Sequence, residues 1–150
     1  YPVPDDVPEC NLNLIDTMDK SSLCIERGRT GTFYIALGVD GIWKIQYNIT
    51  NDKITFKKIT DGNKTFYRIG LGIGPDGDFL RGLKSIYAAA IIDGVYGFYR
   101  SDDDGASWFR INNGNQMFGQ IDCICGDARS FGRFYIATGS RGLLYGEPIQ

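Results

Sequence analysis

The amino-acid sequence predicts an all-β protein made of about three four-stranded antiparallel sheets. Three observations predict this fold class. The 150-residue chain holds 20 glycines, nine tyrosines and nine phenylalanines, a composition typical of short strands joined by tight turns. An aromatic-led strand pair recurs three times with a period of about 50 residues. A turn motif rich in aspartate follows the second copy. Together they favour consecutive blades of a β-propeller.

The internal repeat sets the expected strand boundaries. Its three copies are residues 33–43, 86–99 and 134–145, each an aromatic-led strand, a glycine turn and a second strand. The apolar strands that open the repeats are 22–26, 67–74 and 122–126. A fourth strand follows the first two copies, at 54–59 and 107–111. We therefore expect blades at about 21–59, 66–112 and 120–147, the last without its outer strand.

The segment before the repeats is treated separately. Residues 1–20 form an N-terminal lead-in, and residues 21–150 form the three-blade module. Within the lead-in, NLNLID at 11–16 alternates polar and apolar residues, as a half-buried strand does. It could pair as the missing outer strand of the third blade and close the ring, because proteins usually cover an unpaired edge. The alternative is an unpaired N-terminal arm.

A turn motif, SDDDGASW at 101–108, fits the Asp-box of β-propellers. Its signature positions are Ser101, Asp103, Gly105 and Trp108. We expect Asp103 to accept hydrogen bonds from turn amides, Gly105 to adopt a backbone angle that other residues avoid, and Trp108 to pack under the turn. The spacing does not meet that of a calcium loop. The acids of this segment are therefore predicted to be structural.

The cysteines predict a secreted, disulfide-bonded chain. They are Cys10, Cys24, Cys123 and Cys125. Cys123 and Cys125 lie two apart in a strand-like segment, so their side chains would share a face about 7 Å apart, too far for a mutual bond. We expect two disulfides, at least one of which ties Cys10 to the module. Glycosylation sequons at Asn48 and Asn63 fit secretion.

Composition argues against several classes of function. The chain has no histidine, which removes Ser-His-Asp and Cys-His catalysis and the commonest zinc ligand. With no Cys-x-x-Cys pair either, we expect no metal and no cofactor. A net charge of −2 without a basic cluster argues against nucleic acid. No apolar run approaches the roughly 18 residues of a membrane span. No signal peptide is seen, and Tyr1 looks like the start of a trimmed module.

Two stretches of sequence carry a resemblance to a known family. Residues 86–112 and 118–148 resemble the carboxy-terminal end of glycoside hydrolase family 74, which comprises xyloglucan-cleaving endoglucanases and reducing-end-specific cellobiohydrolases. The resemblance extends over about 31–147. It departs from the family at 46–56, where QYNITNDKITF stands in place of a Ser-Asp-Gly turn, and in the cysteines.

The resemblance implies that this chain corresponds to a part of the family's enzymes that lacks the catalytic centre. In the family two carboxylates act across a cleft between two propellers, the inverting arrangement. Both catalytic aspartates lie upstream of the passage matched here, and no residue of this chain aligns with either. The remaining acids suggest turns, since Asp40 and Asp93 each precede a glycine and Asp76 and Asp78 flank one. We therefore expect no hydrolysis by this chain alone.

Binding is the favoured function. We expect a non-catalytic extracellular module that docks onto a protein partner in a polysaccharide-degrading assembly, as a scaffoldin-type module does. The alternatives are the C-terminal part of a xyloglucan-hydrolysing endoglucanase, or a carbohydrate-binding module for plant glucan. Three blades are fewer than the four to eight of closed propellers, so either the N-terminal strand closes the ring or a partner or a second copy covers the exposed blade faces. Candidate binding residues are Trp43, Tyr47, Tyr96, Tyr99 and Arg141. The alternative for the aromatic residues is packing between blades.

Overall fold

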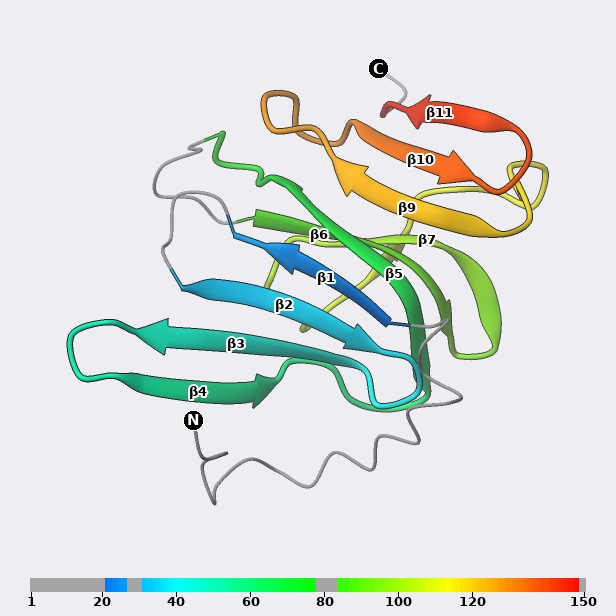
Figure 1. The fold of residues 1–150 in the computed structure, drawn as a ribbon. Helices are drawn as coiled ribbons and strands as arrows, with labels where there is room; N and C mark the ends of the chain where they lie inside the picture. The colour runs from blue at the N-terminus through cyan, green and yellow to red at the C-terminus, as the bar shows by residue number, and fades with distance from the viewer. Residues whose placement is uncertain (1–20, 27–30, 78–83, 149–150) are drawn as a thin grey trace.

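The chain forms three antiparallel β-sheets in the computed structural model, which describes residues 21–26, 31–77 and 84–148 (Figure 1). No helix occurs in these ranges. The described part of the chain therefore contains no helix that could cross a membrane. The predicted all-β fold of three blade-like sheets is confirmed.

The first sheet, blade 1, follows the chain order of its strands. They are β1 (Ser21–Ile25), β2 (Thr32–Leu37), β3 (Ile42–Asn48) and β4 (Lys53–Lys58). Burial alternates along β2, where Tyr34 and Ala36 are buried while Phe33 and Ile35 are partly exposed. This period of two places one set of side chains against the rest of the protein and leaves the other on the opposite face.

The second sheet, blade 2, is the most buried of the three. Its strands are β5 (Lys64–Ile73), β6 (Lys84–Ile92), β7 (Val95–Ser101) and β8 (Phe109–Arg110), in that order. Strand β6 is buried over nearly its whole length because both of its faces are covered. A continuous apolar run such as SIYAAAII is what such a position requires.

The third sheet, blade 3, has three strands. They are β9 (Ile121–Gly126), β10 (Phe134–Thr138) and β11 (Gly142–Gly146). The outer strand predicted to be missing is absent from the described residues. The segment 11–16, which we expected to pair there, lies outside them, so closure of a ring by that strand stays a prediction.

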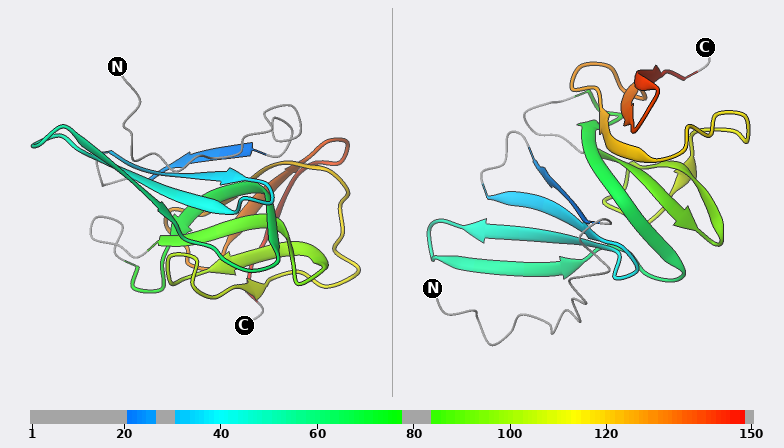
Figure 2. Two further views of the ribbon diagram at one scale, coloured as in Figure 1. Left: turned by 90° about the horizontal axis from the view of Figure 1, so that it is seen from below. Right: turned by 45° about the vertical axis from the view of Figure 1, so that its right-hand side comes forward.

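Two hydrophobic layers join the three sheets, which succeed one another in chain order (Figure 2). The layer between blades 1 and 2 contains Tyr34, Ala36, Ile42, Phe66, Ile69, Ile86, Ala88, Ala90, Ile92 and Tyr99. The layer between blades 2 and 3 contains Tyr87, Ala89, Phe98, Ile121, Ile124, Phe134 and Ile136. Blade 2 is thus packed on both faces, which explains the burial of its strands.

The opening strand of each sheet lies next to that of the following one, since β5 contacts both β1 and β9. Glycine permits this approach on the side of β9. A Cβ atom on Gly70 would lie 2.0 Å from the carbonyl oxygen of Ile124, and one on Gly72 would lie 2.7 Å from the Cα of Gly126. The glycines of β5 therefore set how closely blade 3 packs on blade 2.

The turn that ends β7 has the hydrogen bonds expected of an Asp-box. The carboxylate of Asp103 accepts bonds from the hydroxyl of Ser101 and from the backbone N–H of Ser107, both at 2.8 Å. The Ser101 hydroxyl also accepts the N–H of Gly105, whose φ is +92°. The indole N–H of Trp108 donates to the carbonyl of Gly105 at 3.0 Å. The turn is thereby closed on itself.

Polar contacts also tie blade 1 to blade 2. Asp104, a residue of the Asp-box with φ +59°, accepts a hydrogen bond from the hydroxyl of Tyr34 at 2.8 Å. Its other carboxylate oxygen pairs with the amine of Lys44 at 2.7 Å. A second ion pair, Lys84 with Glu26 at 3.5 Å, is buried between the same two sheets. The Asp-box thus holds two blades together as well as closing its own turn.

The cysteines differ from the sequence-based expectation. Cys24, Cys123 and Cys125 are free thiols, and Cys10 lies outside the described residues. Two disulfides among four cysteines would require at least one bond between two of these three, and the described part of the chain has none. The reason is placement: Cys24 packs against the layer between blades 1 and 2, whereas Cys123 and Cys125 are exposed on β9.

Candidate functional site

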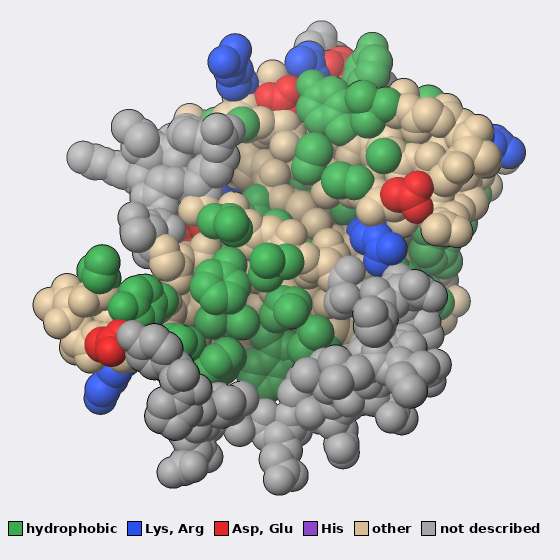
Figure 3. All heavy atoms as spheres, viewed as in Figure 1, with side chains coloured by type: hydrophobic (Ala, Val, Ile, Leu, Met, Phe, Trp, Pro, Cys, Tyr) green, Lys and Arg blue, Asp and Glu red, His purple; other side chains and the backbone are tan. Residues whose placement is uncertain are grey.

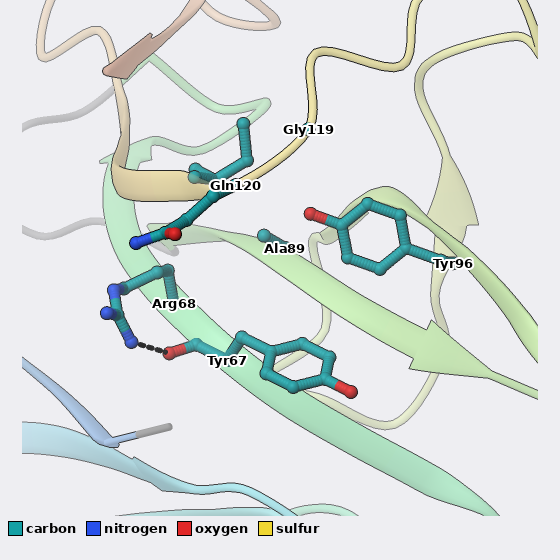
Figure 4. A pocket seen from close by; sticks show the side chains of 7 residues that line it. Tyr67, Arg68, Ala89, Tyr96, Gly119 and Gln120 are labelled. Carbon is teal, nitrogen blue, oxygen red and sulfur yellow. Dashed lines mark hydrogen bonds between the residues drawn. The ribbon is translucent and has the colours of Figure 1, made fainter. Parts of the chain in front are cut away.

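A pocket of about 480 Å³ lies where the start of β9 meets blade 2 (Figure 4). It is within the size range of small-molecule sites. The residues that line it are Tyr67, Arg68, Ala89, Tyr96, Gly119, Gln120 and Ile121. Four separate segments supply them: β5, β6, β7 and the loop that enters β9. The pocket therefore exists only because blade 3 packs on blade 2.

A β-bulge in β5 turns two consecutive side chains into this pocket. Phe66 pairs with Ala90 and Arg68 with Ala89, so Tyr67 is the extra residue without a partner on β6. Consecutive strand residues normally point to opposite faces. The bulge suspends that alternation, and Tyr67 and Arg68 both line the pocket. Bulges are known to re-aim side chains in this way beside functional sites.

A second irregularity lies opposite, at the start of β9. Ala137 pairs with Cys123 and Thr138 with Ile121, which leaves Asp122 unpaired. The Nε of Arg68 donates to the backbone carbonyl of Asp122 at 3.0 Å, and the amide of Gln120 donates to its carboxylate at 3.1 Å. These bonds hold the planar guanidinium and the planar amide in fixed positions at the pocket wall.

Two tyrosine rings form the apolar part of the pocket. Tyr67 and Tyr96 meet edge to face, with ring centroids 6.2 Å apart and planes at 65°. Burial, and to a smaller degree the neighbouring Tyr67, raises the pKa of Tyr96, so its hydroxyl stays protonated. Figure 4 shows the two rings and the Gln120 side chain around one space. The site thus combines ring faces with hydrogen-bonding groups.

The pocket has no features of a metal site. Among the described residues, no three His, Cys, Asp or Glu side chains cluster closely enough to hold an ion. The groups that line the space are two phenols, one guanidinium and one amide, which are suited to a neutral polar ligand.

Of the five binding residues predicted from the sequence, Tyr96 alone lines the pocket. Trp43 and Tyr47 lie on β3 in blade 1. The indole nitrogen of Trp43 is buried without a hydrogen-bond partner in the described chain, and the hydroxyl of Tyr47 donates to Asp52 at 2.9 Å. Arg141 is exposed in the turn between β10 and β11. The predicted residues are therefore spread over three blades.

Tyr99 corrects the prediction. It is buried in the layer between blades 1 and 2, and its hydroxyl donates to the carbonyl of Val95 at 2.7 Å. It packs between blades because it stands directly opposite Ala88 on β6, in the register that faces blade 1. The prediction named packing between blades as the alternative for strand aromatics, and that alternative holds for this residue.

The remaining sequence-based assignments concern turns. The sequon residues Asn48 and Asn63 are both exposed, and their glycosylation stays a prediction. Asp93 precedes Gly94 in the turn between β6 and β7, with φ values of +51° and +80°. Asp40 likewise lies in the turn between β2 and β3. The Asp-Gly pairs form turns, as predicted, and Asp78 lies outside the described residues.

The pocket residues Tyr67, Arg68 and Gln120 were not among the sequence-based candidates. One signal was available. Phe66 and Ile69 are both buried against blade 1 yet are three residues apart, which breaks the period of two that a regular strand requires. The loop residue Gln120 carried no such signal, because its position depends on the packing of blade 3.

The fold and the Asp-box turn define the class of this protein: consecutive blades of a β-propeller. No family model matches the chain. The chain is 38% identical to a xyloglucanase of a Paenibacillus species over 112 residues. It is 34% identical to a probable oligoxyloglucan-reducing end-specific xyloglucanase of Neosartorya fischeri over 126 residues. A family 74 xyloglucanase of Xanthomonas campestris superposes with a TM-score of 0.71 at 30% identity.

These similarities cover most of the chain but a small part of each relative. The two sequence matches span 75% and 81% of this chain and 10% and 14% of the relatives. The structural match spans 86% of this chain and 17% of the Xanthomonas campestris protein. The resemblance to propeller blades of glycoside hydrolase family 74 is therefore confirmed for most of the chain.

Proposed function

We propose that this chain is a non-catalytic, glucan-binding part of a xyloglucan-degrading protein, and that the pocket between blades 2 and 3 holds the sugar. One observation carries the proposal. Two tyrosine rings, a guanidinium and an amide surround a single space of about 480 Å³. The relatives of the chain are named xyloglucanases, which identifies the class of ligand to test first.

The chemistry of the pocket suits a neutral sugar. A pyranose ring has apolar C–H faces that pack on aromatic rings, and hydroxyl groups that both donate and accept hydrogen bonds. Tyr67 and Tyr96 offer ring faces, while Arg68 and Gln120 offer donors at the wall. Because the Arg68 guanidinium already donates to the backbone carbonyls of Tyr67 and Asp122, a bound ligand need not carry a negative charge.

Two carboxyl groups, those of Asp103 and Asp127, are poorly suited to act as a catalytic acid. Inverting hydrolysis requires a general acid whose pKa is raised. Backbone hydrogen bonding from Arg129 lowers the pKa of Asp127. For Asp103, burial alone would raise the pKa, but hydrogen bonds from Ser107 outweigh it and the pKa is lowered. Both carboxylates are held ionised by turns and are unsuited to protonating a leaving group.

Calorimetric titration with xyloglucan oligosaccharides tests the proposal. We expect binding by the unmodified chain and a loss of at least about tenfold, or about 1.4 kcal/mol, for Tyr67→Ala or Tyr96→Ala. Tyr47→Ala is the matched control, because it removes an exposed tyrosine of blade 1 outside the pocket. Absence of binding, or equal binding by all three variants, would contradict the proposal. Release of reducing ends from xyloglucan would contradict its non-catalytic part.

Docking onto a protein, the function favoured by the sequence, is the second candidate. The observation in its favour is a set of exposed apolar side chains on blade 1, among them Leu23 and Ile25. It stands second because an apolar face does not by itself specify a foreign protein, whereas the pocket residues match the chemistry of a sugar.

A further inference from the structure

The loop that joins β8 to β9 contains an asparagine–glycine pair, Asn113-Gly114. No other asparagine of the sequence is followed by glycine. Both residues are exposed, as are the three that follow them. The loop lies at the edge of the molecule where β9 begins, and Figure 3 shows a surface made mainly of uncharged polar side chains and backbone at that edge. Solvent therefore has access to this pair.

A hydrogen bond folds the Asn113 side chain over the peptide that links it to Gly114. Its amide oxygen Oδ1 accepts the backbone N–H of Asn115 at 2.9 Å, which is the bond of an Asx-turn. The ring that this bond closes contains both the side-chain carbon Cγ and the backbone nitrogen of Gly114. The same N–H would stabilise the negative charge that develops on Oδ1 when Cγ is attacked, as the donors of an oxyanion hole do. The turn therefore holds an activated carbonyl carbon beside a nucleophile.

Glycine at position 114 leaves the approach to that nitrogen open. It has no side chain to obstruct the attack, and a Cβ added there would meet no atom within 4 Å. Asn48 provides the contrast. Its Oδ1 accepts the N–H of Thr50 at 2.9 Å, which is the same bond, but Ile49 follows it. A β-branched side chain is bulky and stiff beside its own nitrogen, so it hinders the attack at that site.

We propose that Asn113 is a site of spontaneous modification to isoaspartate. The nitrogen of Gly114 attacks Cγ and loses its proton, the bond from Cγ to Nδ2 breaks, and Nδ2 leaves as ammonia. The cyclic imide that remains takes up one water, which breaks one of its two ring C–N bonds. Opening at the main-chain carbonyl gives isoaspartate, in which the chain runs through the former side chain, and opening at Cγ gives aspartate. Neither step requires an oxidant or a cofactor.

The product would disrupt the loop, because three hydrogen bonds span the modified link. The N–H of Asn113 donates to Oε1 of Gln116 at 3.0 Å, and the N–H of Gln116 donates to the carbonyl of Asn113 at 3.2 Å. The amide of Asn112 donates to the carbonyl of Gln116 at 3.1 Å. Isoaspartate lengthens the main chain by a methylene group and adds a carboxylate, so these bonds cannot all be kept. Gln120 follows in the same loop and lines the pocket, so conversion should weaken binding there, an expectation that rests on the proposed function.

Incubation of the purified chain at pH 8, followed by peptide mapping with mass spectrometry, tests the modification. We expect Asn113 to convert faster than every other asparagine, and a methyltransferase specific for isoaspartate to label the product. Gly114→Ala should slow the conversion by at least about tenfold, and its turn should stay intact because the new methyl group has free space. Ile49→Gly should make Asn48 reactive, because this exposed position then has both features.

The unmodified chain unfolded in urea is the control for the role of the fold. It keeps the asparagine–glycine pair but loses the turn, so the native chain should convert at least as fast as the unfolded one. Three results would each overturn the proposal: conversion of Asn113 no faster than that of Asn115, no effect of Gly114→Ala, or a native chain that converts much more slowly than the unfolded one.

Calorimetry before and after incubation tests the coupling to the pocket. The unmodified chain should lose affinity for xyloglucan oligosaccharides, whereas Gly114→Ala should keep it. An incubated chain that binds as tightly as the fresh one, although Asn113 is converted, would overturn the coupling. A fresh chain that binds no sugar would instead refute the proposed function, and mass spectrometry would still decide whether Asn113 is modified.

Discussion

Replacing Asp104 by alanine should weaken the contact between blades 1 and 2. The carboxylate accepts the hydroxyl of Tyr34 at 2.8 Å and pairs with the amine of Lys44 at 2.7 Å. Tyr34 is buried, so its hydroxyl would lose the acceptor that the structure provides for it. Burial, followed by the hydrogen bond to Asp104, raises the pKa of Tyr34, which keeps the group a donor at every physiological pH.

The magnitude follows from three contributions. Leaving the buried hydroxyl of Tyr34 unsatisfied costs about 1–3 kcal/mol. The lost ion pair, which is partly exposed, adds at most about 1 kcal/mol. Alanine also tolerates a φ of +59° less well than aspartate, whose short polar side chain favours that region. We expect the free energy of unfolding to fall by roughly 2–4 kcal/mol.

Urea denaturation at neutral pH measures this change in the free energy of unfolding. Asp104→Asn is the matched control. It retains an acceptor for Tyr34 and tolerance of the positive φ, and removes only the charge, so it should lose about 1 kcal/mol or less. If Asp104→Ala lay within about 0.5 kcal/mol of the unmodified chain, as ordinary surface changes do, the inferred role of Asp104 would be wrong.

Three further predictions concern packing, thiol reactivity and acid stability. Gly70→Ala should lower the free energy of unfolding by about 3 kcal/mol or more, because the new Cβ would lie 2.0 Å from a carbonyl oxygen of β9. An unchanged midpoint of urea denaturation would contradict the close approach of β5 to β9. Burial raises the pKa of Cys24 to about 12, so iodoacetamide at pH 8 should label the exposed Cys123 before Cys24. Peptide mapping measures the two rates, and equally fast labelling of Cys24 would contradict this prediction. Backbone hydrogen bonding from Arg129 lowers the pKa of Asp127, so its ionised form stabilises the fold above the ordinary value of 3.8, and this contribution is lost as the pH falls through the lowered pKa. Asp127→Asn should therefore flatten the dependence of stability on pH below about pH 4, and an unchanged slope would refute this.

Local patterns in the sequence were sufficient for the blade boundaries and the Asp-box. Strand periodicity and glycine turns depend on residues within a few positions of one another, so 22–26, 54–59 and 122–126 were correctly placed as strands. The Asp-box likewise closes through contacts between Ser101 and Trp108 that span a single turn. Such contacts are encoded in one short segment and can be predicted from it.

The pocket could not be predicted in the same way. Tyr67 and Arg68 reach it through a bulge, and Gln120 reaches it only because blade 3 packs on blade 2. The burial of Tyr99 also depends on which face of β7 meets blade 1. These outcomes rest on register and on contacts between residues far apart in the chain, which periodicity does not report.

The sequence by itself determined the all-β class, the number of blades and the place of the Asp-box, because each is set by short-range alternation and turn chemistry. The tertiary structure alone decided which faces are covered. Leu23 and Ile124 occupy the same place in the repeat, because each pairs with the residue that follows the repeat tyrosine, yet Leu23 is exposed and Ile124 is buried. The difference is whether another sheet packs on them, and the burial of apolar surface between sheets is a property of the assembled fold.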